Sequence, residues 1–142
     1  MRREYPTAPI PGVGALIIRD GFVLLVKRGQ EPGKELGSIP GGVVELGETG
    51  HQDVVREVNE ETGLDVEVER LLEVGDVIVH DEAGNVKYHY VMINFLVRVV
   101  GGVVKATSDA SNVRWFPINR LSGESVTKTT RRLLGMVVTH AS

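Results

Sequence analysis

The sequence feature that most constrains this chain is one stretch, residues 40–64, which reads PGGVVELGETGHQDVVREVNEETGL. Thr49 followed three residues later by Gln52 is a capping box, in which the two side chains satisfy free backbone N–H groups at a helix start. Gly63 supplies the left-handed position that commonly ends a helix. We therefore predict a helix over residues 49–62. Its inward stripe, at helical spacing, comprises Val54, Val55, Val58 and Thr62.

The other face of this helix concentrates negative charge. Its charged residues are Asp53, Arg56, Glu57, Glu60 and Glu61. Glu57 has like charges three or four positions away on both sides, and each such pair costs roughly 0.2–0.5 kcal/mol in an isolated helix. Arg56 offsets only part of this repulsion, through Asp53 and Glu60. The pattern indicates that a cation from outside the sequence completes the charge balance.

Two interpretations fit this acidic face. A solvated helix surface is the simpler one. The alternative is a metal site, because Gly41 and Gly42 lie just upstream and can bring backbone carbonyls close to the same carboxylates. Hard cations such as Mg²⁺ take carboxylate and carbonyl oxygens together. The combination favours a divalent-metal site.

The same stretch matches the Nudix box, G-x5-E-x7-R-E-U-x-E-E-x-G-U with U aliphatic, at every specified position. The match begins at Gly42, passes through Glu48 and continues over residues 56–64. The nine fixed positions make this a specific motif, unlike an isolated glycine pattern. The chain therefore resembles a Nudix hydrolase.

The resemblance implies a role for each box residue. The metal, Mg²⁺ or Mn²⁺, is held by three glutamates and a backbone carbonyl. These ligands are Glu57, Glu60, Glu61 and the carbonyl of Gly41. Arg56 commonly pairs with Glu48, which orients the loop on the helix, so we assign these two residues, with Gly42 and Gly63, to the architecture of the site.

The chemistry that such a site suits is attack by water on a pyrophosphate linkage. A metal lowers the pKa of bound water and neutralises charge on the phosphate oxygens. A carboxylate that the metal does not fully occupy can take the water's proton. Glu57 and then Glu60 are the candidates for this base.

Four positions outside the box are candidate substrate contacts. Lys27 and Arg28 end a predicted strand before the glycine loop, where they either contact phosphate or lie in solvent. Tyr88 and Tyr90 lie on one face of another predicted strand, and that face can line a base pocket. His89 points the other way, and we do not favour it as a metal ligand.

An additional acidic group is expected from a loop late in the chain. Nudix proteins often bring a further ligand or base from just before a strand that here contains Trp115, and Asp109 lies in that region. Glutamate is commoner at this place, and a turn-capping aspartate is the alternative. Glu82 is a weaker rival. Trp115 itself, beside Phe116, is predicted to be part of the core rather than a stacking platform.

The remaining sequence predicts an α/β fold. As the resemblance also implies, residues 1–142 form one domain, an α/β/α sandwich in which a mixed central sheet lies between the box helix and a closing helix. Asp20-Gly21 predicts a two-residue hairpin turn. The predicted segments are an extended N-terminal arm (1–12), strands (14–19, 22–27, 43–45, 65–80, 86–100, 103–106 and 113–117) and the closing helix (127–138).

Composition restricts the partners and the location. A net charge of −3 over 142 residues gives no electrostatic argument for a nucleic-acid polymer. The chain has no cysteine, which excludes disulfides and thiolate sites. Its start has no apolar signal-peptide core, and no run approaches the roughly 18 apolar residues that suggest a membrane span. We expect a cytoplasmic protein without membrane contact. A homodimer is compatible with the sequence, which does not establish it.

Three functions remain open. The best supported is hydrolysis of ADP-ribose or a nucleotide sugar, although a proline typical of ADP-ribose-preferring members about fifteen residues beyond the box is missing at residues 79–81. The alternative is a nucleoside triphosphate pyrophosphohydrolase, including one for oxidised or non-standard nucleotides, which residues 11–17 and 88–91 resemble. The remote alternative is a non-catalytic nucleotide-binding module, which would usually have a degraded box or an attached DNA-binding domain.

Overall fold

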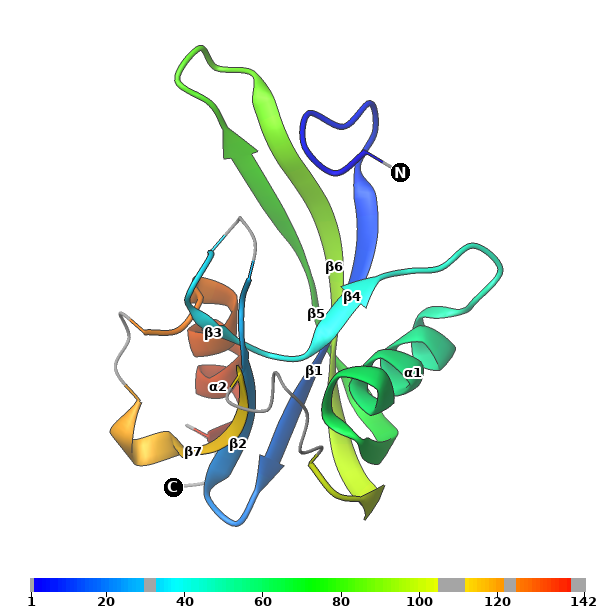
Figure 1. The fold of residues 1–142 in the computed structure, drawn as a ribbon, viewed down its shortest axis with the longest axis vertical. Helices are drawn as coiled ribbons and strands as arrows, with labels where there is room; N and C mark the ends of the chain where they lie inside the picture. The colour runs from blue at the N-terminus through cyan, green and yellow to red at the C-terminus, as the bar shows by residue number, and fades with distance from the viewer. Residues whose placement is uncertain (1, 30–32, 105–111, 122–124, 139–142) are drawn as a thin grey trace.

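The computed structural model describes residues 2–29, 33–104, 112–121 and 125–138 (Figure 1). Its elements in chain order are β1 (Ile10–Arg19), β2 (Phe22–Lys27), β3 (Gly37–Ser38), β4 (Gly41–Val43), α1 (Gly50–Thr62), β5 (Leu64–His80), β6 (Val86–Gly102), β7 (Val113–Pro117), the 3₁₀ helix η2 (Ile118–Arg120) and α2 (Lys128–Val138). No helix in these ranges is long and apolar enough to cross a membrane.

Strand β1 connects the parts of the sheet. The main strand order is β3-β2-β1-β6-β5, with β4 paired to β1 and β7 paired to β2. β1 runs parallel to β6 but antiparallel to β2 and β4, and β5 and β6 form a long antiparallel pair. The predicted turn joins β1 to β2, with positive φ at both Asp20 and Gly21, as hairpin turns of this length require. The predicted mixed sheet is confirmed.

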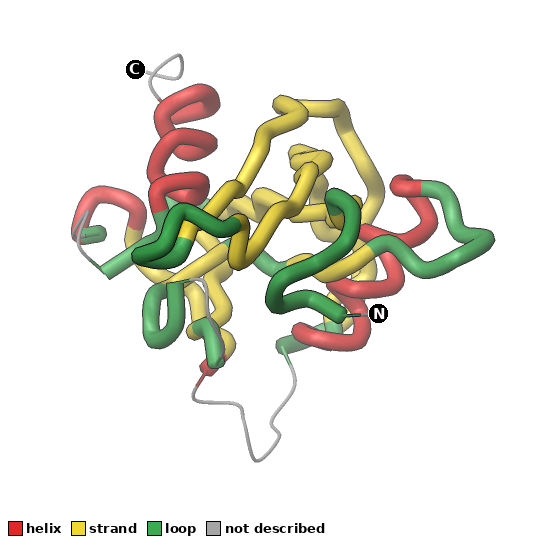
Figure 2. The backbone as a smooth tube through the Cα atoms, turned by 90° about the horizontal axis from the view of Figure 1, so that it is seen from above, coloured by secondary structure: helices red, strands yellow, loops and turns green. Residues whose placement is uncertain are grey.

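The two helices cover opposite faces of the sheet, as Figure 2 shows. Alternate residues of β1 reach both sides: Val13 and Ile17 pack in one buried cluster with Val54 and Val58 of α1. Leu16 packs in a second cluster, together with residues of α2. An apolar strand that is buried on both faces explains why β1 lacks the polar alternation of a half-exposed strand. The predicted α/β/α sandwich is confirmed.

The box helix begins and ends as predicted. The Thr49 side chain accepts a hydrogen bond from the Gln52 N–H (3.1 Å), and the Gln52 side chain accepts one from the Thr49 N–H (3.0 Å). Gly63 caps the other end with φ +86°, and its N–H donates to the Asn59 carbonyl. β5 starts immediately afterwards at Leu64, so α1 is fixed at both ends by short connections.

Three predicted boundaries were wrong. β1 starts at Ile10, so the last residues of the predicted arm are part of the sheet, where Pro11 lies opposite Val91. The short strand of the glycine loop is β4 at Gly41–Val43, two residues earlier than predicted, because these are the residues that pair with β1. Val103 and Val104 follow β6 without forming a strand, and the rest of that predicted hairpin lies outside the described residues.

An ion pair links the sheet to α2. Glu73 of β5 accepts hydrogen bonds from Arg132 Nε (2.9 Å) and Nη2 (2.6 Å). These bonds lower the pKa of Glu73, whose side chain is 18% exposed. A carboxyl with a lowered pKa in the folded state adds stability above its ordinary pKa, and this stability is lost as the pH falls through the folded-state pKa.

We therefore expect Glu73→Gln to reduce the free energy of unfolding at pH 7 by about 0.5–1 kcal/mol, the range of a partly exposed pair. The difference from the unsubstituted protein should disappear as the pH falls through the folded-state pKa of Glu73. Urea titrations across acidic and neutral pH measure this. Glu67→Gln is the matched control: it removes a more exposed pair with Arg98, within β5–β6, and should cost less. A pH-independent loss in Glu73→Gln would contradict the assignment.

Candidate functional site

Backbone and carboxylate come into contact where β4 passes α1. A side-chain carbon added at Gly42 would lie 2.6 Å from Cδ of Glu57, so the carboxylate rests directly on the bare backbone. One added at Gly41 would lie 2.0 Å from the carbonyl oxygen of Val13, because β4 is pressed against β1. The Gly41 N–H also donates to Oε1 of Glu61 (3.0 Å). The structure therefore brings the glycine pair together with two of the three predicted ligands.

Arg56 is the cation at the centre of the surrounding carboxylates. Its Nε donates to both oxygens of Glu48, at 3.0 and 3.1 Å, so the pair implied by the resemblance is present. Its Nη1 donates to Glu60 (2.9 Å), and its Nη2 contacts Asp53 (3.0 Å) and Glu57 (3.4 Å). These bonds, with Glu60 first, raise the pKa of Arg56. One positive charge thus serves four carboxylates, and the site keeps a negative excess.

Asp53 has a role that the sequence did not reveal. It was predicted on the exposed acidic face, but its side chain is fully buried. Oδ2 accepts hydrogen bonds from the Glu45 N–H (2.9 Å) and from Arg56, whereas Oδ1 is buried with no hydrogen-bond partner among the described residues. The loop before the helix folds back over the first turn and covers Asp53, and the three-residue spacing to Arg56 was the available signal. Asp53 ties this loop to α1.

The carboxylates nearest the glycine pair are hard to ionise. Burial raises the pKa of Glu61 to about 7, although the Gly41 N–H and the charge of Arg28 act in the opposite direction. Burial also raises the pKa of Glu57, aided by the charges of Asp53 and Glu60. Burial is the main cause of both raised values, and the charges of neighbouring carboxylates add to it. A bound cation would stabilise both carboxylates in their ionised form.

The oxygen atoms gathered here are of the kinds that bind a divalent metal ion. Glu57 and Glu61 offer hard oxygens beside the exposed backbone of Gly41 and Gly42, which is the combination that Mg²⁺ prefers. In the described ranges, no three His, Asp or Glu side chains already converge as a metal-binding group. Glu60, the third predicted ligand, is instead directed to Arg56 and has a 59% exposed side chain. Its predicted role therefore requires it to leave that ion pair.

The two basic residues at the end of β2 lie in different surroundings. Arg28 lies close enough to Glu61 for its charge to oppose the rise in the pKa of that residue. Lys27 pairs with Glu35 (2.9 Å) and lines a separate cavity. The structure thus brings Arg28, but not Lys27, to the box carboxylates. Alternation along the strand explains the separation.

The tyrosines lie farther along the sheet. Gly41 pairs with Gly14, which pairs with Asn94 of β6, so Asn94 marks the level of the glycine loop. Tyr90 and Tyr88 are four and six residues away, or about 13 and 20 Å of extended strand. Tyr88 is buried, and its hydroxyl lies 3.4 Å from a carboxylate oxygen of Glu4. Substrate contact by Tyr90 stays a prediction, and Tyr88 packs against the N-terminal segment.

The other residues singled out in the sequence have three different outcomes. Asp109 lies outside the described residues. Glu82 is exposed in the turn between β5 and β6, and His89 lies next to Tyr88 near that end of β6, so neither belongs to the group around Glu57. Trp115 packs against the α1 side of the core with the Arg19 guanidinium 5.2 Å from its ring centre, which confirms its predicted place in the core.

Comparisons with known proteins agree with the motif. The profile of the NUDIX domain matches residues 8–134. An ADP-ribose pyrophosphatase of Methanocaldococcus jannaschii is 41% identical over 113 residues, which cover 80% of this chain and 64% of that protein. The chain therefore spans less than two thirds of that relative's length.

Two solved structures resemble the whole fold. A MutT NUDIX hydrolase from Burkholderia pseudomallei has a TM-score of 0.70 and 32% identity, covering 92% of this chain and 98% of that one. A UDP-X diphosphatase has a TM-score of 0.72 and 26% identity, covering 96% of this chain and 66% of that one. Similarity at these levels extends well beyond the box itself.

The contacts at the glycine pair predict different outcomes for two similar substitutions. Gly42→Ala should fold normally but displace the flexible carboxylate of Glu57, and so weaken Mn²⁺ binding by about 10- to 100-fold. Gly41→Ala forces a methyl group against the backbone of β1 and should lower the free energy of unfolding by about 1–3 kcal/mol. Calorimetric Mn²⁺ titration and thermal melting separate the two effects. Unchanged Mn²⁺ affinity in Gly42→Ala would remove Glu57 from the site.

Proposed function

The chain belongs to the NUDIX domain family, and on that premise we propose that it is a metal-dependent hydrolase of a pyrophosphate linkage within a nucleoside diphosphate joined to another group. The observation that carries the proposal is the contact of Glu57 and Glu61 with the backbone of Gly41 and Gly42. Both carboxylates have a raised pKa, which a bound cation would reverse.

The proposed substrate is ADP-ribose or a nucleotide sugar. The support comes from the relative named ADP-ribose pyrophosphatase at 41% identity and from the likeness to a UDP-X diphosphatase. Both names describe cleavage of a diphosphate that carries a second group. Because the proline expected at residues 79–81 is absent, we extend the proposal from ADP-ribose to nucleotide sugars as a class.

A second candidate is pyrophosphate release from nucleoside triphosphates. The observation that favours it is the match to a MutT hydrolase, of which this chain covers 98%. The same box can serve both reactions, since the bond that is cleaved is a phosphoanhydride in each. The two candidates therefore differ in how the rest of the substrate is held.

Each residue at the site has a definite task in the proposed reaction. Glu57, Glu61 and the carbonyl of Gly41 would hold Mg²⁺ or Mn²⁺, with Glu60 as a further ligand. A bound divalent ion supplies charge neutralisation of the phosphates and an activated water. Glu57 is the preferred base, because Glu60 is engaged by Arg56 at 2.9 Å whereas Glu57 lies 3.4 Å from that guanidinium.

The supporting residues hold this arrangement in place. Arg56 binds Glu48 in the loop and Asp53 in the helix, so it fixes the loop against α1. Its positive charge also neutralises part of the negative charge of these carboxylates. Arg28 approaches the same site from β2 and is suited to contact a phosphate oxygen of the substrate. The expected partner is a small nucleotide rather than a nucleic-acid polymer, in line with the net charge of −3.

Removal of either central carboxylate tests the function. We expect Glu57→Gln and Glu61→Gln each to lower turnover by at least about 100-fold, because the metal ligands are lost while the shape is kept. Turnover is measured with Mg²⁺ on ADP-ribose, nucleotide sugars and nucleoside triphosphates, with product identification. A nucleoside monophosphate with a sugar phosphate, such as AMP with ribose 5-phosphate from ADP-ribose, identifies the first candidate, and monophosphate with pyrophosphate identifies the second.

The matched control is Glu69→Gln, which removes an exposed carboxylate of β5 outside the box and should leave turnover unchanged. Circular dichroism checks that each variant is folded. Near-normal turnover in both box variants would overturn the proposed metal site. Tight nucleotide binding without metal-dependent hydrolysis of any compound in the panel would identify a binding module instead.

A further inference from the structure

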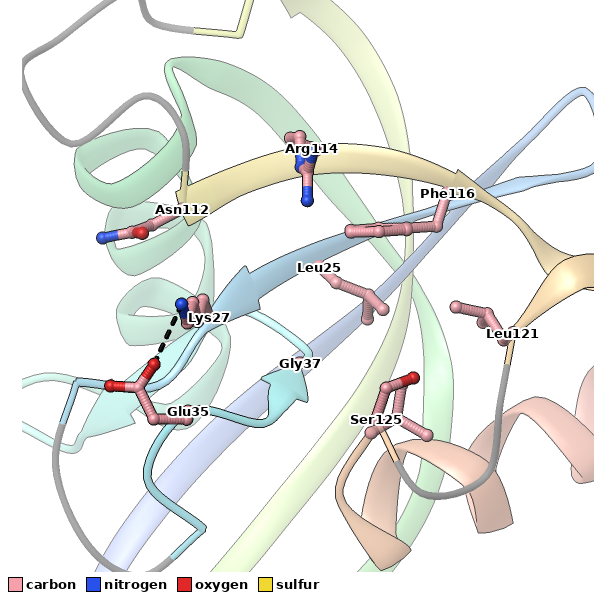
Figure 3. A pocket seen from close by; sticks show the side chains of 10 residues that line it. Leu25, Lys27, Glu35, Gly37, Asn112, Arg114, Phe116, Leu121 and Ser125 are labelled. Carbon is pink, nitrogen blue, oxygen red and sulfur yellow. Dashed lines mark ion pairs between the residues drawn. The ribbon is translucent and has the colours of Figure 1, made fainter.

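The cavity that Lys27 lines has a volume of about 250 Å³ and lies between β2, β7 and the segment that leads to α2 (Figure 3). Its position on the sheet separates it from the box. Leu24 and Trp115 pack on the side of α1, whereas Leu25, which lines the cavity, packs on the side of α2. The cavity therefore opens on the opposite face of β2 and β7 from the glutamates of α1.

One end of this cavity is polar and carries net positive charge. Figure 3 shows Lys27, Glu35 and Asn112 at this end, with Arg114 above them. Lys27 and Glu35 form an ion pair (2.9 Å), so Arg114 supplies the uncompensated charge. Arg114 is exposed, its guanidinium lies 5.0 Å from the centre of the Phe116 ring, and it donates no hydrogen bond to any part of the chain that is described. A planar guanidinium at this place suits a phosphate.

The other end of the cavity is mainly apolar, although Ser125 also lies there. Leu25, Phe116 and Leu121 lie together there (Figure 3). These side chains offer no hydrogen bonds to sugar hydroxyl groups, but they can cover a flat, apolar ring. The amide of Asn112 provides both a donor and an acceptor. The two ends together fit an amphipathic anion rather than a bare ion or a simple sugar phosphate.

We propose that this cavity is a second ligand site, which binds a phosphate monoester carrying a heteroaromatic ring, that is, the nucleoside monophosphate class. Arg114 binds the phosphate, the apolar end packs on the ring, and Asn112 contacts a polar edge. Glu35 competes with the phosphate for Lys27. The site requires no hydrolysis and no metal, so it does not depend on the proposed function.

The test is isothermal titration of the whole chain with AMP in the absence of divalent metal. AMP has no pyrophosphate linkage, so it is not consumed. We expect Arg114→Gln to weaken AMP binding at least about tenfold and Glu35→Gln to strengthen it severalfold by releasing Lys27. Arg120→Gln is the matched control: this exposed arginine of η2 does not line the cavity, and its loss should leave the affinity unchanged.

Two further comparisons separate this site from the box and test the ligand class. Arg28→Gln, which removes the cation expected to contact phosphate at the box, should bind AMP as the unsubstituted protein does; if it weakens AMP binding as much as Arg114→Gln, AMP is bound at the box as a reaction product and the proposal is wrong. Inorganic phosphate and ribose 5-phosphate should bind at least about tenfold more weakly than AMP. Equal binding of ribose 5-phosphate, no binding of AMP, or unaltered binding in a folded Arg114→Gln would each overturn it.

Discussion

The structure depends on a close approach that leaves no space for side chains. At Gly41 the backbone of β4 is packed against the backbone of β1, and at Gly42 it meets the carboxylate of Glu57. Gly14 of β1 meets the same restriction on its other side, where an added carbon would lie 2.5 Å from the Asn94 side chain. These contacts allow a strand, a loop and a helix to share one small volume. The site forms because β1, β4 and the Glu57 side chain approach one another so closely at these glycines.

The site also depends on the balance of charge between Arg56 and the carboxylates around it. Glu48, Asp53, Glu57 and Glu60 are all in reach of one guanidinium, and Asp53 is completely buried. Burying a carboxylate is costly unless it is paired and hydrogen-bonded. Arg56 offsets the repulsion among these carboxylates but leaves Glu57 and Glu61 short of a counter-charge. Stability and affinity for a cation thus have a common electrostatic origin.

The parts predicted from the sequence were those with local causes. The capping box, the glycine at the helix end and the Asp20-Gly21 turn each act within a few residues, and all three are present. The Nudix resemblance supplied the sandwich and the pairing of Arg56 with Glu48.

What the sequence did not reveal depends on contacts between distant segments. The burial of Asp53 requires the Glu45 backbone to fold over it, and the strand position of Gly41–Val43 is set by its pairing with β1. The cavity at Arg114 arises only when β7, β2 and the approach to α2 meet. The hydrophobic periodicity of a single segment does not indicate which distant segments it will contact.

Because a single residue separates α1 from β5, the position of the C-terminal end of α1 depends on the position of β5 in the sheet. Because Gly63 is the only link between Thr62 and Leu64, the end of α1 cannot move independently of the first residue of β5. A slip of β5 against β6 by one residue would shift that end by about 3.3 Å. Such a displacement exceeds the length of a hydrogen bond, and it would pull Glu61 away from the Gly41 N–H. The register between β5 and β6 therefore also sets the position of the α1 carboxylates relative to the glycine pair.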